Sequence, residues 1–202
     1  MKWNYLPLLL LLACGQNPGT DPSELTEKFN AAWQSNDPDK VLKIRMELAE
    51  MAPRQPEGLY AKAWLADRSG DSRKAIKTAD TLVMGFPQFD KGWYLRANLR
   101  EKSGDLQGAA QDYDRALKRN PLFSEALINR GSLHFRTQHY DLALKDFEKA
   151  GNISPGNRLV FRNLGNVWMA FGKPEKACPC WRKADSLGMP GTDTLLKKYC
   201  LP

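Results

Sequence analysis

The sequence is poor in the residues and motifs that enzymes use. It has two histidines and four cysteines in 202 residues, and it contains no G-x-S-x-G, H-E-x-x-H or glycine-rich phosphate-binding motif. His134 and His139 belong to no such motif, and packed or capping histidines are the simpler interpretation. Cys178-Pro179-Cys180 lacks a second cysteine pair or a nearby histidine that would complete a four-ligand zinc site. We therefore expect no enzymatic activity, no metal and no cofactor.

A long hydrophobic run is also missing. The apolar stretch from Leu6 to Ala13 is far shorter than the roughly 20 residues that a membrane-spanning helix needs. It follows a short segment with one positive charge, Lys2, which is the order of a secretory signal. Residues 1–13 are therefore predicted to be a cleaved signal peptide and not a membrane span.

The end of this stretch, Leu11-Leu12-Ala13-Cys14, resembles the lipobox of bacterial lipoproteins. The resemblance implies cleavage after Ala13 and a diacylglycerol on Cys14. The alternative is an ordinary secretory cleavage site that a cysteine follows by chance. Residues 14–21 are polar and turn-forming, as in a flexible tether. Gly15, where an aspartate would favour the inner membrane, implies an anchor in the outer membrane facing the periplasm.

The rest of the composition is typical of a chain that buries a core, with 42% hydrophobic and 26% charged residues. The net charge of +7 could indicate nucleic acid as a partner. However, lysines and arginines are spread along the whole chain, and the signal directs it to a compartment without nucleic acid. We expect proteins or peptides of the cell envelope as partners, and no nucleic acid.

Four prolines stand at a constant interval. Pro53, Pro87, Pro121 and Pro155 are each separated by 34 residues, which suits a helix, a turn, a second helix and a turn. Small residues recur in the same frame, where close helix packing requires them: they are Ala75, Ala109, Ala143 and Ala177 at the twentieth position, and Ala63, Ala97, Gly131 and Gly165 at the eighth. Large rings recur at the twenty-fourth position as Tyr113, Phe147 and Trp181, whereas the first repeat departs with Phe29 at the eighth position and Arg45 at the twenty-fourth.

This pattern resembles the tetratricopeptide repeat. The resemblance implies an all-α fold, a right-handed superhelical array (an α-solenoid) of about five helix-turn-helix units over residues 22–189. The units would start at Pro22, Pro56, Asp90, Ser124 and Arg158, and a capping helix would occupy residues 190–202. The alternative is another all-helical bundle with accidental phasing.

In this family the first helix of each repeat lines a concave face on which ligand peptides lie. The family positions map here to Tyr60, Trp64, Arg68, Tyr94, Asn98, Lys102, Asn129, Phe135, Arg136, Arg162, Asn163 and Asn166. Amides can pair with an extended backbone, and rings supply contact area at low entropy cost. Packing of Trp64 or Phe135 between neighbouring helices remains an equal alternative.

Two functions fit this architecture. The first is a membrane-anchored adaptor or scaffold that binds a protein of the cell envelope. The second is a periplasmic chaperone or carrier that binds exported polypeptides.

Two further contacts follow from the repeat frame. Arg96 and Asp112 occupy positions that Arg130 and Asp146 occupy one repeat later, which predicts two ion pairs between the helices of a repeat.

For the cysteines, Cys178 and Cys200 are predicted to reach the same end of a terminal helical hairpin and to form a disulfide, with Cys180 a free buried thiol. Three unpaired cysteines are the alternative.

Overall fold

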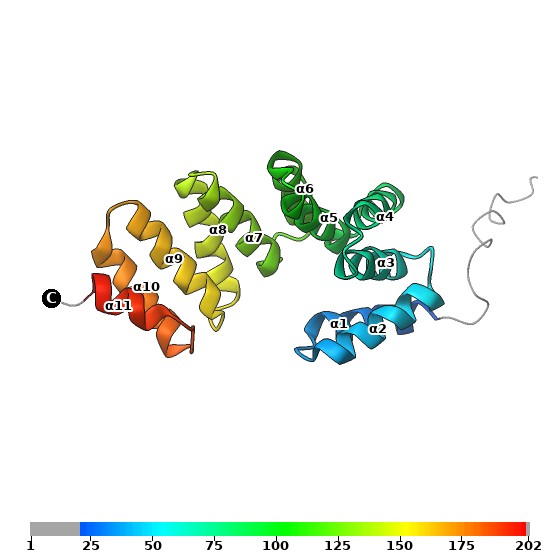
Figure 1. The fold of residues 1–202 in the computed structure, drawn as a ribbon, viewed down its shortest axis with the longest axis horizontal. Helices are drawn as coiled ribbons and strands as arrows, with labels where there is room; N and C mark the ends of the chain where they lie inside the picture. The colour runs from blue at the N-terminus through cyan, green and yellow to red at the C-terminus, as the bar shows by residue number, and fades with distance from the viewer. Residues whose placement is uncertain (1–20, 201–202) are drawn as a thin grey trace, which may run out of the picture. The chain divides into compact units, whose positions relative to one another are not determined.

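The computed structural model describes residues 21–200, and over that range the chain forms α-helices and no strand (Figure 1). The predicted signal peptide, Cys14 and all but the last residue of the predicted tether lie outside the described residues. The helices are α1 (Pro22–Gln34), α2 (Pro38–Met51), α3 (Pro56–Arg68), α4 (Ser72–Gly85), α5 (Asp90–Lys102), α6 (Leu106–Arg119), α7 (Ser124–Arg136), α8 (Tyr140–Ile153), α9 (Arg158–Ala170), α10 (Pro174–Ser186) and α11 (Thr192–Tyr199).

Local sequence signals set many of these boundaries. Asp37, Asp71 and Asp105 each accept a hydrogen bond from a backbone N–H in the first turn of α2, α4 and α6, which satisfies a donor that the helix itself leaves free. Prolines begin α1, α2, α3 and α10, because their missing N–H has no helical partner at that position anyway. These capping residues explain why the helices alternate with short turns.

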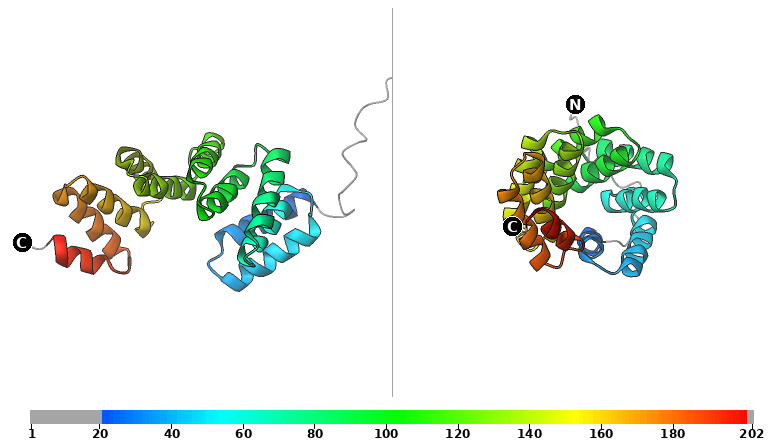
Figure 2. Two further views of the ribbon diagram at one scale, coloured as in Figure 1. Left: turned by 45° about the horizontal axis from the view of Figure 1, so that its top comes forward. Right: turned by 60° about the vertical axis from the view of Figure 1, so that its left-hand side comes forward.

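The chain divides after Leu99 into two compact units, unit 1 before this point and unit 2 from Arg100 onward. In unit 1, α2 packs against both α1 and α3, and α3 packs against α4. In unit 2, successive helices from α6 to α11 pack against one another. Figure 2 shows the antiparallel helix pairs within each unit from two further directions.

Within a repeat of unit 2, a ring from the second helix fits into a gap on the first. The side chains of Phe147 and Trp181 are fully buried. A Cβ atom at Gly131 or Gly165 would overlap these rings. Glycine at the eighth position of the repeat therefore allows the two helices to approach closely.

The first repeat reverses this arrangement. Phe29 projects from α1 where the later repeats have a small residue, and Arg45 projects from α2 where they have a ring. The Arg45 guanidinium carbon lies 4.7 Å from the centre of the Phe29 ring and 4.5 Å from that of Tyr60. Arg45 is only 3% exposed, its Nε and Nη1 atoms have no hydrogen-bond partner, and burial lowers its pKa. Stacking on two rings partly offsets the loss of hydration.

The fourth repeat has an unusual turn between its helices. The corresponding turns of other repeats contain Gly70, Gly104 and Gly172 with positive φ, but here Gln138 has a φ of 63°. The next residue, His139, precedes α8 without a side-chain capping bond.

The imidazole of His134, on α7, has a lowered pKa. The main cause is burial, and the charges of Arg130 and His139 lower the pKa further, whereas Asp146 and Asp114 oppose this shift.

One of the two predicted ion pairs is confirmed. Arg130 donates two hydrogen bonds to Asp146, at 2.8 and 2.6 Å, and a third to Asp114 at 2.7 Å. It therefore ties α7 to both α6 and α8.

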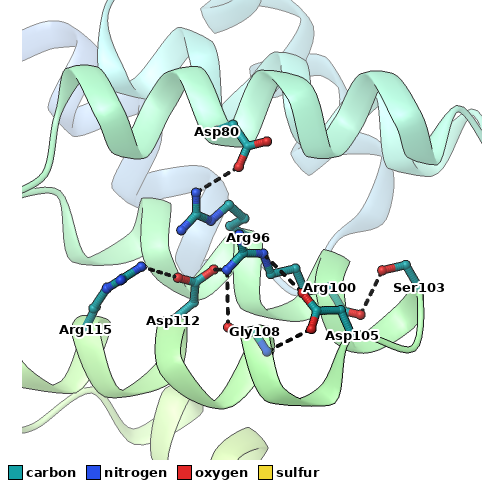
Figure 3. Close-up of polar contacts among 8 residues, drawn as sticks. All are labelled: Asp80, Arg96, Arg100, Ser103, Asp105, Gly108, Asp112 and Arg115. Atoms are coloured by element: carbon teal, nitrogen blue, oxygen red, sulfur yellow. Dashed lines mark hydrogen bonds and ion pairs between the residues drawn. The ribbon is translucent and has the colours of Figure 1, made fainter.

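The other predicted pair, Arg96 with Asp112, would join the two units and stays a prediction. Within unit 1, Arg96 bonds Asp80 at 2.8 Å. Within unit 2, Asp112 is 0% exposed and accepts hydrogen bonds from Arg100 at 2.8 Å and Arg115 at 3.1 Å (Figure 3). Two arginines thus compensate one buried carboxylate.

Helix α11 caps the C-terminal end of unit 2. A disulfide joins Cys178 on α10 to Cys200, the pairing expected from the sequence, and Cys180 is free. The sequence predicted a buried thiol at Cys180, but this residue is partly exposed. Its partial burial raises the pKa of the thiol. The two cysteines are 22 residues apart, and closing a loop of this length stabilises the folded state by roughly 3 kcal/mol. The disulfide therefore holds the terminal helix in place.

We predict that Gly165→Ala lowers the free energy of unfolding by about 1–3 kcal/mol, because the new methyl group overlaps the Trp181 ring. Urea denaturation followed by circular dichroism measures this change. Gly85→Ala is the control, because no atom lies within 4 Å of the new Cβ, and its effect should stay within about 1 kcal/mol. Equal effects of the two substitutions would contradict the close approach of α9 and α10.

We predict that acid destabilises the protein through His134. The pKa of His134 is lower in the folded protein than in the unfolded chain, so the imidazole is protonated more readily in the unfolded chain. The contribution of neutral His134 is complete above the unfolded pKa of about 6.5 and is lost as the pH falls towards the folded value.

His134→Phe should therefore reduce the loss of unfolding free energy between about pH 7 and about pH 5.5, as measured by denaturation at each pH. His139→Gln, which keeps His134, should retain the loss. An unchanged pH dependence in His134→Phe would show that burial of this imidazole has no effect on stability.

Candidate peptide-binding surface

Four of the residues predicted for the concave face lie together in unit 2. Phe135 and Arg136 come from the last turn of α7, and Asn163 and Asn166 come from the middle of α9. Together with Ser132 and Phe147 they line a cavity of about 120 Å³. We call this cavity and its rim the α7–α9 groove.

The amides of the groove retain hydrogen-bonding capacity. Asn163 donates a long hydrogen bond of 3.5 Å from Nδ2 to Ser132. Asn166 accepts a hydrogen bond at Oδ1 from the indole of Trp181, at 3.2 Å. Among the described residues, the Asn163 oxygen and the Asn166 amino group have no partner. One acceptor and one donor, the pair that an extended backbone requires, are thus available at this groove.

Two arginines predicted for the concave face of unit 2, Arg136 and Arg162, differ in how their charges are compensated. Arg136 forms an ion pair with Glu101 at 2.6 Å, and the other oxygen of Glu101 accepts a hydrogen bond from Tyr113. The guanidinium of Arg162 on α9 has no ion pair within the part of the chain that the structure describes. Arg162 does not itself line the cavity, but among the described residues of α9 its charge remains available to a carboxylate of a ligand.

Two other predicted residues of unit 2, Lys102 and Asn129, are exposed and half-buried respectively, and neither lines the α7–α9 groove. They lie on α5 and α7. Fewer residues of unit 2 therefore line the cavity than the sequence pattern predicts for the concave face.

The predicted residues of unit 1 form a different surface. Tyr60 is only 4% exposed, so its prediction as an accessible contact is wrong. Its ring packs against those of Phe29, Trp33 and Phe89, at 5.0, 6.0 and 6.4 Å between centres. Phe29, large where a small residue is usual, supplies the ring that covers it.

The remaining residues predicted in unit 1 are Trp64, Arg68, Tyr94 and Asn98. Trp64, Tyr94 and Asn98 are half-buried, and Arg68 is exposed. Trp64 packs against the core of unit 1, as the alternative interpretation has it, and the Arg68 guanidinium lies 5.5 Å from its ring centre. Trp64 and Arg68 therefore contribute contacts within the unit as well as to its surface.

Unit 2 has a second cavity, of about 290 Å³, that was not predicted from the sequence. It is mostly apolar and is lined by Leu106, Gln107, Ala110, Leu133, His134, Thr137, His139 and Leu142. The signal that could have revealed it is the fourth repeat's turn, where Gln138-His139 replaces the Gly-Asp of two other repeats. Among the described residues, no group of three or more histidine, cysteine or acidic side chains is placed to hold a metal.

Comparison with known proteins identifies the repeats. The model of the family described as tetratricopeptide repeat matches residues 60–116 and 94–158. No curated protein matches the sequence.

Solved structures resemble most of the chain. A crystal structure of TTC0263, a thermophilic tetratricopeptide repeat (TPR) protein of Thermus thermophilus, has a TM-score of 0.65 and 19% identity over 86% of this chain and 96% of its own. MamA has a TM-score of 0.64 and 17% identity over 90% and 99%. YrrB, described as a tetratricopeptide repeat protein with an unusual peptide-binding site, has a TM-score of 0.62 and 18% identity over 88% of this chain and 92% of its own.

Identities this low show the fold alone, because function depends on the residues of a particular site. The family match and the structural likenesses agree with the helix pairs of the fold. The chain contains tetratricopeptide repeats and folds as an α-solenoid of these units.

Proposed function

We propose that this protein is a membrane-anchored adaptor or scaffold that binds a partner protein of the cell envelope through the α7–α9 groove. The observation that carries the proposal is the convergence of Phe135, Arg136, Asn163 and Asn166 on one cavity. A ring, a cation and amides are the side chains that hold a peptide by area, charge and backbone pairing.

The groove favours a preferred partner over many weak ones. Amides alone would hold any extended backbone, as in a chaperone or carrier of exported chains. The cavity of about 120 Å³ adds a requirement of side-chain size, and Arg162, which precedes Asn163 on α9, adds a requirement of charge. A carboxylate and a small side chain in the partner would meet both requirements.

The envelope location rests on the sequence. The lipobox-like Leu11-Leu12-Ala13-Cys14 supports a lipid anchor, with the outer membrane facing the periplasm as its place. Among the described residues, no helix is long and apolar enough to cross a membrane. In this proposal, acyl chains on Cys14 supply the membrane affinity, at about 0.8 kcal/mol per buried methylene.

We predict that crosslinking in cells, followed by mass spectrometry, captures one abundant partner in a fixed ratio. Asn163→Ala should weaken its binding about tenfold, because an amide that pairs with the partner's backbone is lost. Asn152→Ala is the matched control, since Asn152 is an exposed amide on α8 that does not line the cavity.

Capture of many partners in small amounts would instead identify a carrier of exported chains. Equal binding by the Asn163 and Asn152 variants would remove the α7–α9 groove from the proposal.

We predict that Cys14→Ser releases the protein from the membrane fraction or leaves an uncleaved precursor. The reason is that the acyl chains provide nearly all of the membrane affinity. Fractionation and intact-mass measurement of the purified protein distinguish these forms. A variant that matures and fractionates like the original protein would contradict the lipid anchor.

A further inference from the structure

The first and third repeats of unit 1 are in direct contact. In a solenoid each repeat normally touches only its neighbours. Here the rings of Trp33 on α1 and Tyr94 on α5 lie 5.6 Å apart between centres. The Lys91 ammonium, also on α5, donates a hydrogen bond to Asn30 on α1 at 3.1 Å. Helix α1 therefore reaches past α3 to α5.

Aromatic and cationic groups reinforce this contact. The Phe29 ring lies 5.4 Å from Phe89, which comes just before α5. The Lys91 ammonium lies 4.8 Å from the centre of the Phe29 ring and 4.7 Å from that of Trp33. Because Phe29 and Trp33 are four residues apart, they project from one face of α1. Phe29 and Trp33, on one face of α1, thus contact residues of the third repeat.

A buried charge opposes the same arrangement. Arg45 has two nitrogen atoms without a hydrogen-bond partner, and its guanidinium stacks on Phe29. Movement of α1 away from α3 and α5 would remove one of its stacking rings and admit water to these atoms. The closed state therefore gains ring and cation contacts but leaves donors unsatisfied.

We propose that Tyr60, Phe89, Lys91 and Tyr94 form a helix-binding surface in unit 1, and that α1 is its displaceable resident. The residues of α1 define the chemistry of a partner that would replace it. That partner is an amphipathic helix with two aromatic residues four positions apart and an amide between them, as in Phe29-Asn30-Ala31-Ala32-Trp33. This surface is distinct from the α7–α9 groove.

Hydrogen exchange of the full-length protein tests the resident helix without any partner. Lys91→Met should speed the exchange of α1 amides by about tenfold or more, because it removes the cation and the bond to Asn30. Arg45→Met should slow the same amides by a similar factor, because it removes the unsatisfied donors while filling the space. Lys176→Met is the control, since Lys176 lies 4.5 Å from the Trp168 ring in unit 2, and it should leave α1 unchanged.

A fluorescent peptide of residues 22–34 tests the surface itself. It should bind the full-length Trp33→Ala variant at least about tenfold more tightly than the original protein, because the resident helix then competes less well. The same peptide carrying Trp33→Ala should lose this binding.

These outcomes decide the proposal independently of the α7–α9 groove. Unchanged α1 exchange in Lys91→Met, or faster exchange in Arg45→Met, would overturn the idea of a displaceable helix. Equal peptide binding by the original and Trp33→Ala proteins, or no binding by either, would overturn the helix-binding surface.

Discussion

The close approach of two helices within a repeat is the constraint on which the rest of the structure depends. In unit 2 a glycine on the first helix receives the ring of Phe147 or Trp181 from the second. Side chains next to this contact on the first helix are then held in place as well. The amides of Asn163 and Asn166 belong to the same helix as Gly165, and the indole of Trp181 itself donates to Asn166. The contact that packs the repeat therefore also orients its binding surface.

The effect of a buried charge on stability depends on the groups that surround it. Asp112 is fully buried but accepts hydrogen bonds from Arg100 and Arg115, so its charge is compensated. Arg45 is buried to a similar degree but has aromatic rings in place of a carboxylate. Removal of a partner from a buried pair is strongly destabilising, whereas replacement of an uncompensated charge by an apolar side chain is often favourable. The two residues should thus respond to substitution in opposite directions.

Much of the fold could be predicted from the sequence because its signals are local. Aspartate caps, prolines at helix starts and glycines in turns act within a few residues. The 34-residue period fixed the frame for Arg130 with Asp146, and the lengths of the two terminal helices placed Cys178 and Cys200 at the same end of their hairpin. The burial of Tyr60 could not be predicted, since it depends on Phe29 and Phe89, which are distant in sequence. The partial exposure of Cys180 and the cavity beside His134 likewise depend on how whole helices pack. A repeat pattern states which positions face a neighbour, but not whether that neighbour covers them.

The contact between the first and third repeats changes how unit 1 should respond to perturbation. When each repeat touches only its neighbours, stability is a sum of local terms and a terminal repeat can fray alone. Trp33, Asn30 and their partners Tyr94 and Lys91 add a term that spans two repeats. Loss of α1 from its place then weakens α5 as well, so the first three repeats are coupled. Unit 2 stabilises its end by another means, a disulfide that fixes α11 on α10. Within the described residues, the last helix is thus held by a covalent bond, whereas α1 is held by the noncovalent contacts that, in the proposal above, a competing helix would replace.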